Sequence, residues 1–141
     1  MNKNRVMITS HLPGERFAEF KNSSDFEVLI LDNKKREELG KAAAEFSPHA
    51  IISLLSDRID QSLIEILPDL KVISNYAVGY NNIDVAYAQK KGVVVTNTPG
   101  VLTDSTADIA IMLMLMVTRR AAESEKFTRD GDFNGWLPDL F

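Results

Sequence analysis

The chain has 141 residues, of which 45% are hydrophobic and 26% are charged, so it can bury one globular core. A net charge of -4 argues against a nucleic-acid partner, and the lack of cysteine excludes disulfides and thiolate chemistry. The longest apolar stretch, residues 107–117, is about half of the roughly 20 residues that a membrane span needs. The first residues also lack a signal-peptide core. We therefore expect a cytoplasmic protein with no membrane partner.

Short runs rich in β-branched residues alternate with helical patterns through the first hundred residues. The predicted strands are residues 5–9, 26–31, 50–55, 71–77 and 93–96, and the predicted helices are residues 15–21, 34–46, 61–67 and 83–91. Nearly continuous apolar strands separated by helices predict an α/β fold, a flavodoxin-like, doubly wound parallel five-stranded sheet. Gly92 after two lysines indicates the end of the last of these helices, and Asn82 could cap its start.

The last third of the chain has a different pattern. Residues 103–129 predict one long helix whose apolar first half must be covered on all sides, in a core or an interface. The tail that follows carries apolar side chains that need another surface: Phe133, Trp136, Leu137, Leu140 and Phe141. We therefore divide the chain into a domain of residues 1–102, an interface helix of residues 103–130 and an aromatic tail of residues 131–141.

Ligands of open α/β sheets collect beyond the carboxyl ends of the strands, here at residues 10–14, 56–59, 78–82 and 97–103. Gly79 could bring backbone N–H groups and a helix dipole to an anion such as a carboxylate, or it could only permit a tight turn. Thr103 or Asp104 could cap the long helix. Alternatively, the Thr103 hydroxyl could face a cofactor phosphate or nicotinamide. The spacing of these residues leaves both pairs of alternatives open.

Other residues carry weaker functional signals. Asp57 follows the third predicted strand, as does the phospho-acceptor of a receiver domain, but the required carboxylates and lysine are missing from residues 10–12 and 97–99. We therefore interpret Asp57 as a helix cap or a solvated residue. His11 and His49 have no paired acid or further ligands, so we interpret them as loop residues and predict no metal site. The charged stretch at residues 34–38 predicts a solvated helix face.

A long segment, residues 70–120, reads LKVISNYAVGYNNIDVAYAQKKGVVVTNTPGVLTDSTADIAIMLMLMVTRR. It resembles the D-isomer-specific 2-hydroxyacid dehydrogenases, particularly the glyoxylate and hydroxypyruvate reductase branch. Residues 50–71 and 134–141 resemble the same family, whereas the first 45 or so residues match it by pattern alone. The resemblance implies an oxidoreductase that reduces small 2-keto acids to D-2-hydroxy acids with NAD or NADP.

The resemblance also implies roles for particular residues. The backbone N–H groups of Val78 and Gly79 would hold the substrate carboxylate, and Leu55 would line the substrate pocket. Thr103 would lie near the bound nicotinamide cofactor, and the helix that begins there would contribute to a homodimer interface. Trp136 would either anchor the tail by packing or reach into the partner subunit's active site.

The chain departs from the family pattern in one large respect. It holds no G-x-G-x-x-G phosphate-binding motif, and the resemblance assigns the catalytic arginine, the histidine acid–base and its carboxylate partner to sequence beyond residue 141. A helix that covers the substrate domain would come from there too. We therefore expect no catalytic residue in this chain and no activity from it alone. The alternative is a truncated, non-catalytic remnant that self-associates through residues 107–117 and the aromatic tail.

Overall fold

A computed structural model of the chain describes residues 3–31 and 36–140. The chain divides into two compact units between Pro99 and Gly100, and each is described by itself. The first unit contains a parallel five-stranded sheet with strand order β2-β1-β3-β4-β5. This order and the flanking helices confirm the predicted flavodoxin-like α/β fold.

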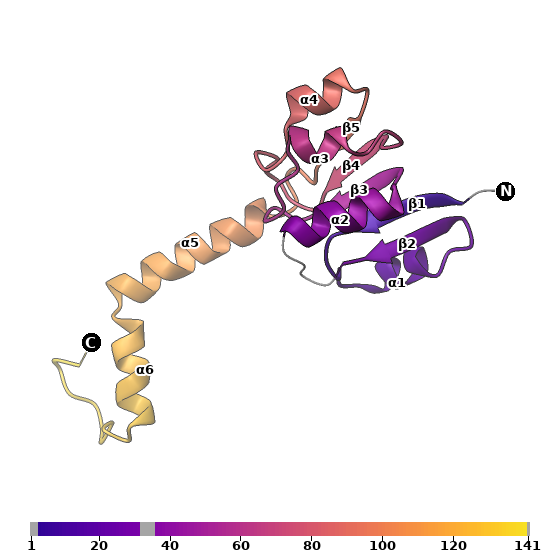
Figure 1. Ribbon diagram of the computed structural model, residues 1–141. Coiled ribbons are helices and arrows are strands. Elements are labelled where there is room, and N and C mark those ends of the chain that lie inside the picture. The colour runs from indigo at the N-terminus through magenta and orange to yellow at the C-terminus, as the bar shows by residue number, and fades with distance from the viewer. Residues whose placement is uncertain (1–2, 32–35, 141) are drawn as a thin grey trace. The chain divides into compact units, whose positions relative to one another are not determined.

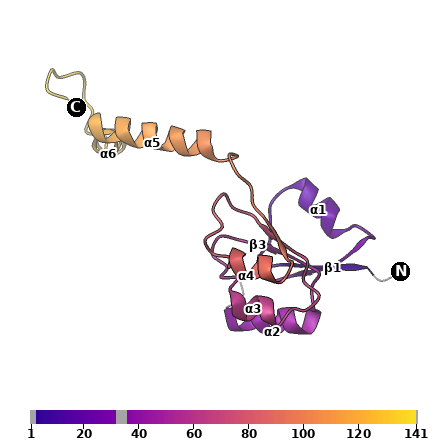
Figure 2. The same ribbon diagram turned by 90° about the horizontal axis from the view of Figure 1, so that it is seen from above.

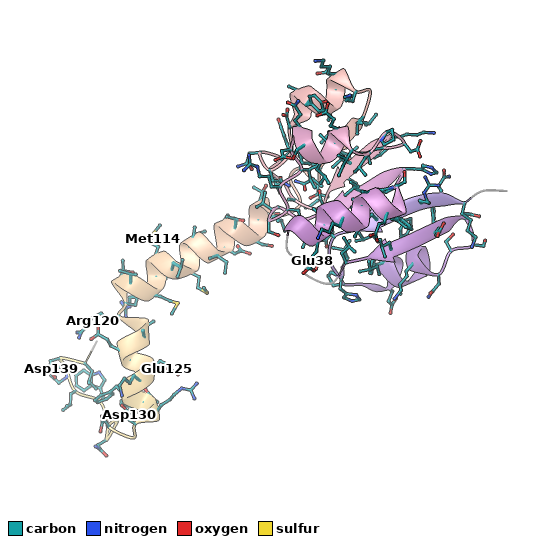
Figure 3. The ribbon with its side chains drawn as sticks, viewed as in Figure 1. Glu38, Met114, Arg120, Glu125, Asp130 and Asp139 are labelled. Carbon is teal, nitrogen blue, oxygen red and sulfur yellow. The ribbon has the colours of Figure 1, made fainter. Side chains whose placement is uncertain are left out.

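All predicted strands and short helices of the first unit are present, with small shifts at their ends (Figure 1). Residues 34–35 of the predicted second helix lie outside the described residues, and Glu38 in its charged stretch is exposed (Figure 3). The elements are β1 Asn4–Ile8, α1 Glu15–Lys21, β2 Phe26–Ile30, α2 Arg36–Phe46, β3 Ala50–Ser53, α3 Gln61–Glu65, β4 Val72–Asn75, α4 Val85–Lys90 and β5 Val94–Thr96.

Helices cover both faces of the sheet, and Figure 2 shows α1 on the side opposite α2, α3 and α4. Alternate residues of the central strands supply the core beneath the three helices, including the fully buried Met7, Ile51 and Ile73. Burying each such side chain stabilises the fold by roughly 1.5–3 kcal/mol. On the other face, Phe17 and Phe20 of α1 pack on the remaining apolar side chains of β1, β2 and β3.

The α1 side of the sheet is covered over only part of its width. Val93, just before β5, and Val95 within it pack with the three-helix core, so Val94 between them points to the α1 side. Val94 pairs in register with Val72 and remains 58% exposed. Among the described residues of the first unit, α1 is the helix on this face, and it packs against the apolar side chains of β1, β2 and β3. The β4–β5 half of this face is therefore open to solvent in the first unit.

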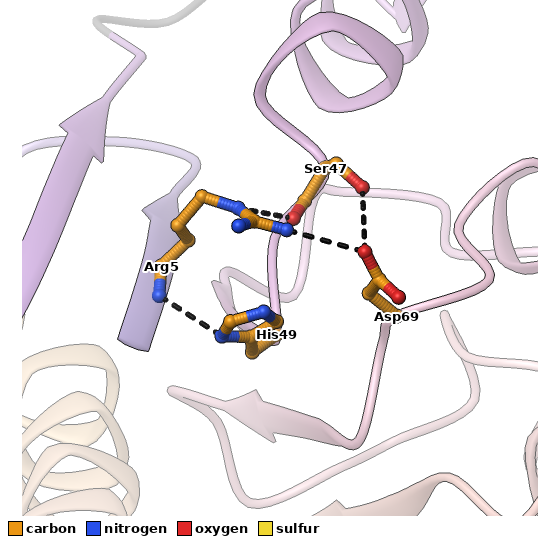
Figure 4. Close-up of polar contacts among 4 residues, drawn as sticks. All are labelled: Arg5, Ser47, His49 and Asp69. Atoms are coloured by element: carbon orange, nitrogen blue, oxygen red, sulfur yellow. Dashed lines mark hydrogen bonds and ion pairs between the residues drawn. The ribbon is translucent and has the colours of Figure 1, made fainter. Parts of the chain in front are cut away.

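The amino-terminal edge of the sheet is fastened by a polar cluster (Figure 4). Arg5 Nε donates to the Ser47 carbonyl oxygen at 2.7 Å, and its guanidinium pairs with Asp69 at 3.2 Å. The Ser47 hydroxyl donates to Asp69, and the Arg5 N–H donates to His49 Nδ1 at 3.2 Å. His49 is thus a loop residue with a structural hydrogen bond, as predicted. This edge lies at the end of the sheet opposite to the carboxyl-terminal loops.

The second unit corrects the prediction of one long helix over residues 103–129. Two helices are present, α5 Thr103–Thr118 and α6 Ala121–Arg129, and the chain turns at Arg120, which has φ 50 (Figure 3). The Thr118 hydroxyl at the end of α5 donates back to the Met114 carbonyl oxygen at 2.9 Å. Arg120 then pairs with Glu123 in the first turn of α6 through two hydrogen bonds.

The start of α5 also differs from the prediction, because Leu102 is its N-cap and no side chain caps it. Neither Thr103 nor Asp104 therefore caps the helix. No residue of α5 is buried within its unit, and its apolar side chains, such as Leu113 and Val117, are exposed there. Among the described residues, no helix has both the length and the apolar character needed to cross a membrane.

Candidate functional site

The loop that follows β4 has its carbonyl oxygens fixed by the surrounding chain. The Ala77 carbonyl oxygen accepts from the Thr98 N–H at 2.9 Å, and the Val78 carbonyl oxygen accepts from Asn97 Nδ2 at 2.8 Å. The Gly79 carbonyl oxygen accepts from Asn75 Nδ2 at 2.7 Å. Hydrogen bonds from β4 and from the loop after β5 therefore hold consecutive peptide groups of this loop.

Two N–H groups of the same loop, unlike these carbonyl oxygens, are not held by hydrogen bonds within the described residues. Among the residues that the structure describes, the backbone N–H groups of Val78 and Gly79 donate to no acceptor of the chain. Val78 is 42% exposed and Gly79 is also exposed, so these donors are open to solvent or to a ligand. Adjacent unpaired N–H groups are suited to an anion such as a carboxylate, whose oxygens accept charge-assisted hydrogen bonds.

Leu55, in the loop after β3, lies beside Gly79. A Cβ atom added to Gly79 would lie 3.8 Å from Leu55 Cδ1, so no other side chain separates the two residues. Leu55 is 55% exposed, and together with Asn81 and Arg58 it lines a surface depression between the loops that follow β3 and β4. The structure thus places Leu55 beside Gly79, the residue that follows Val78 in the chain.

Gly79 is not explained by the tight-turn alternative. Its φ lies outside the left-handed region, and an added Cβ would meet its nearest neighbour, Asn81 Oδ1, at an ordinary 3.5 Å. The helix-dipole part of the prediction is also wrong, because α4 begins only at Val85 and has 6 residues. The free loop N–H groups themselves are the feature that could bind an anion.

The predicted cap of α4 was wrong as well. Asp84 is the N-cap, and its side chain accepts from the Tyr87 N–H at 2.9 Å. Asn82 instead joins two loops, since its Nδ2 donates to the carbonyl oxygens of Leu54 at 3.1 Å and Asp57 at 2.9 Å. Three Asx residues occur within four positions of this loop, and composition alone does not distinguish the cap among them.

A buried polar network beneath the site was missed by the sequence reasoning. Asn75 is fully buried at the end of β4, where its Oδ1 accepts from Ser53 Oγ at 2.9 Å and its Nδ2 donates to Asn82 Oδ1 at 3.0 Å. A parallel bridge between Ile59 and Ile83 joins the same two loops. The available signal was an asparagine ending an otherwise apolar strand, because buried amides require hydrogen-bond partners.

Asp57 belongs to a neighbouring part of this framework. Its carboxylate accepts from the Leu54 N–H at 2.7 Å and from the Thr9 hydroxyl. Asp57 is therefore neither a helix cap nor a simply solvated residue, which corrects the prediction. It joins the end of β1 to the loop after β3. His11, the other histidine considered, is exposed in the loop after β1, as predicted.

The remaining predicted site residues belong to the second unit. Thr103 is the exposed first residue of α5. Trp136 is 79% exposed in the tail, with Phe133 and Leu137 exposed nearby, and Phe141 lies outside the described residues. Across residues 3–31 and 36–140, no group of His, Cys, Asp or Glu side chains is arranged to hold a metal ion.

The sequence holds no glycine-rich dinucleotide-binding motif. Its seven glycines occur at positions 14, 40, 79, 92, 100, 131 and 135, and no arrangement of them forms G-x-G-x-x-G. The exposed Thr103 hydroxyl alone cannot cradle a pyrophosphate, which needs several backbone N–H groups at a helix N-terminus.

Several known proteins are similar to this chain over most of its length. The model of the D-isomer specific 2-hydroxyacid dehydrogenase catalytic domain matches residues 6–130. A glyoxylate reductase of Pyrococcus horikoshii is 40% identical over 99% of this chain, which spans 42% of that protein. A Thermus thermophilus protein of known structure is 36% identical, with a TM-score of 0.85 over 96% of this chain and 43% of its own.

A second solved structure adds a cofactor to the comparison. It is a D-isomer specific 2-hydroxyacid dehydrogenase of Polaromonas, described as NAD-binding, with a TM-score of 0.80 and 28% identity over 98% of this chain and 43% of its own. The chain thus spans less than half the length of the proteins that it matches. The matches cover both the sheet and the segment that follows it. The chain therefore belongs to the D-isomer specific 2-hydroxyacid dehydrogenase family, whose catalytic-domain model it matches.

Proposed function

We propose that this chain supplies the substrate-side domain of an NAD(P)-dependent oxidoreductase that reduces small 2-keto acids, of the glyoxylate or hydroxypyruvate type, to D-2-hydroxy acids. The observation that carries the proposal is the pair of unpaired, exposed N–H groups at Val78 and Gly79, beside Leu55. Family membership and the similarity to a glyoxylate reductase support the same substrate class.

The proposed roles follow from the chemistry of each group. The N–H groups of Val78 and Gly79 bind the carboxylate that all 2-keto acids share, and they fix its orientation. Leu55 packs against the rest of the substrate and excludes water from one side. A short apolar wall favours substrates with few carbon atoms beyond the keto group. None of these residues transfers a proton or a hydride.

The nicotinamide cofactor supplies the hydride in this family's chemistry, and this chain's residues do not form a site for it. The cofactor's phosphates, the proton donor and the carbonyl-polarising arginine require residues other than those described here. The choice of NAD or NADP is part of the proposal, with the NAD-binding relative as its support. Thr103 and Trp136 remain proposed contacts to the nicotinamide and to a partner's active site, respectively.

Self-association through α5 is part of the same proposal. The helix buries no residue within its unit, although its sequence from Ile109 to Val117 is entirely apolar. A helix of this kind needs a covering surface. A homodimer supplies one by symmetry, since each α5 can cover the other. The exposed aromatic side chains of the tail, Phe133 and Trp136, are candidates for the same interface.

The test is a protein extended through the downstream sequence of its gene and assayed for nicotinamide-cofactor binding and for oxidation of NADH or NADPH with glyoxylate and hydroxypyruvate. We expect turnover with at least one of these acids and none with acetate, which lacks the keto group. The 141-residue chain alone serves as the matched control and should show no NADH oxidation. An extended protein that binds no cofactor and reduces no short 2-keto acid would refute the proposal.

A further inference from the structure

The carboxylate-binding role depends on where the loop N–H groups point, and their direction is set by the carbonyl groups that precede them. Each peptide group is planar, and no cis peptide bond occurs among the described residues. In a trans peptide, the carbonyl of one residue and the N–H of the next point in opposite directions. A donor that holds a carbonyl oxygen therefore turns the next N–H away from itself.

This relation connects particular side chains to particular N–H groups. Asn97 Nδ2 holds the Val78 carbonyl oxygen at 2.8 Å, so Asn97 directs the Gly79 N–H. Asn75 Nδ2 holds the Gly79 carbonyl oxygen at 2.7 Å, so Asn75 directs the Tyr80 N–H. The Val78 N–H is directed in the same way by the backbone bond from Thr98 to Ala77.

The two asparagines differ in how firmly they are themselves held. Asn75 is fully buried and has Ser53 and Asn82 as further partners. Asn97 follows β5 directly and is half-buried. The Tyr80 N–H, like those of Val78 and Gly79, donates to no acceptor within the described part of the chain. The loop thus presents consecutive free N–H groups, and side chains outside the loop hold the peptide groups that carry them.

We propose that Asn97 and Asn75 are positioning residues of the carboxylate site, which aim the Gly79 and Tyr80 N–H groups at the substrate carboxylate. The inference rests on the proposed function. It extends the binding group from Val78 and Gly79 to Tyr80. It also explains the asparagines that end β4 and follow β5, which make side-chain bonds to loop carbonyls. Neither asparagine touches the substrate in this scheme.

Asn97→Leu is the main test variant, because leucine has nearly the same size, carries no charge and cannot donate a hydrogen bond. Asn97 is half-buried, so the substitution leaves the core intact. The matched control is Asn134→Leu, which removes a similar donor from the tail, where Asn134 Nδ2 donates to the Asp132 carbonyl oxygen. Asn75→Leu is not used here, because it would leave the buried Ser53 hydroxyl without a partner.

The experiment is an NMR titration of the ¹⁵N-labelled 141-residue chain with glycolate, and chloride serves as the ionic-strength control. In the unsubstituted chain, we expect saturable shifts of the Val78, Gly79 and Tyr80 amide resonances. Asn97→Leu should weaken glycolate binding about tenfold, as expected for one misdirected charge-assisted hydrogen bond. Asn134→Leu should bind glycolate as the unsubstituted chain does.

A readout of orientation separates positioning from a merely structural role. Residual dipolar couplings report the direction of each N–H bond, and in Asn97→Leu the coupling of Gly79 should change while that of Ile73 in β4 stays the same. Unchanged affinity, or an unchanged Gly79 coupling, would overturn the positioning role and leave the carboxylate site standing. Absence of any saturable shift in the unsubstituted chain would refute the carboxylate site itself, and the positioning role with it.

Discussion

Replacing Asn75 with alanine should destabilise the first unit by an amount that can be estimated from its partners. The substitution removes hydrogen bonds to Ser53, Gly79 and Asn82. Ser53 is fully buried, so its stranded hydroxyl costs about 1–3 kcal/mol. Losing the bonds to the exposed Gly79 and the half-buried Asn82 costs less, about 1 kcal/mol in total, because water can partly replace them. We expect a loss of about 2–4 kcal/mol, out of a total of roughly 5–15 kcal/mol.

The assay is native-state hydrogen exchange of the β3 and β4 amides, which reports the free energy of opening for this unit alone. Ser53→Ala and the double variant complete a cycle. The double variant removes the stranded hydroxyl, so it should be about 1–2 kcal/mol less destabilised than the sum of the single variants. Asn81→Ala, at an exposed position of the same loop, serves as the control and should change stability by less than about 0.5 kcal/mol. Additivity of the Ser53 and Asn75 effects within about 0.5 kcal/mol would refute the network as described.

Three further predictions concern surfaces and charges. Leu113→Asp should raise the dissociation constant of the proposed dimer by about 100-fold or more, because burying an unpaired charge in an interface costs free energy. Light scattering that finds the unsubstituted chain monomeric at micromolar concentration would contradict the interface. Val94→Lys should change the stability of this chain by less than about 0.5 kcal/mol in urea unfolding, but should destabilise an extended protein in which a helix covers the β4–β5 half-face. The side-chain hydrogen bond from Arg120 lowers the pKa of Glu123 below its ordinary 4.5, so this pair should stabilise the first turn of α6 above that pH and lose its effect as the pH falls further. Amide exchange in α6 should show this loss, and Glu123→Gln should remove the part of the pH dependence that the Arg120–Glu123 pair contributes.

The first unit was predictable from sequence because its strands are separated by clear helix and turn signals. Gly92, for example, has φ 74° and directly follows Lys91, the C-cap of α4. Its position after two lysines had indicated this helix end. Apolar strand runs also located the carboxyl-terminal loops correctly, and the resemblance led to the proposal of Val78, Gly79 and Leu55 as site residues within them. These positions follow from local pattern and from the general geometry of parallel sheets.

The errors arose where several residues of one type compete or where contacts between distant residues decide the outcome. Asn82 and Asp84 are equally good caps by composition, and long-range bonds from Asn82 to the loop after β3 decide between them. Arginine is a good helix former, so residues 119–120 gave no sign of a helix break. The roles of Asn75 and Asn97 depend on loop carbonyls, which a sequence pattern does not reveal.

The parallel bridge between Ile59 and Ile83 and the hydrogen bonds of the Asn82 amide hold the loops after β3 and β4 rigidly together. Fixing the backbone of one residue costs roughly 1–2 kcal/mol in conformational entropy. In these loops the cost is met when the chain folds, so ligand binding does not have to meet it. A two- or three-carbon acid offers few atoms with which to compensate for ordering a loop. Binding sites for very small anions therefore depend on such rigidity more than sites for large ligands do. A substitution that loosens the Ile59–Ile83 bridge should weaken glycolate binding, although neither residue contacts glycolate in the proposed site.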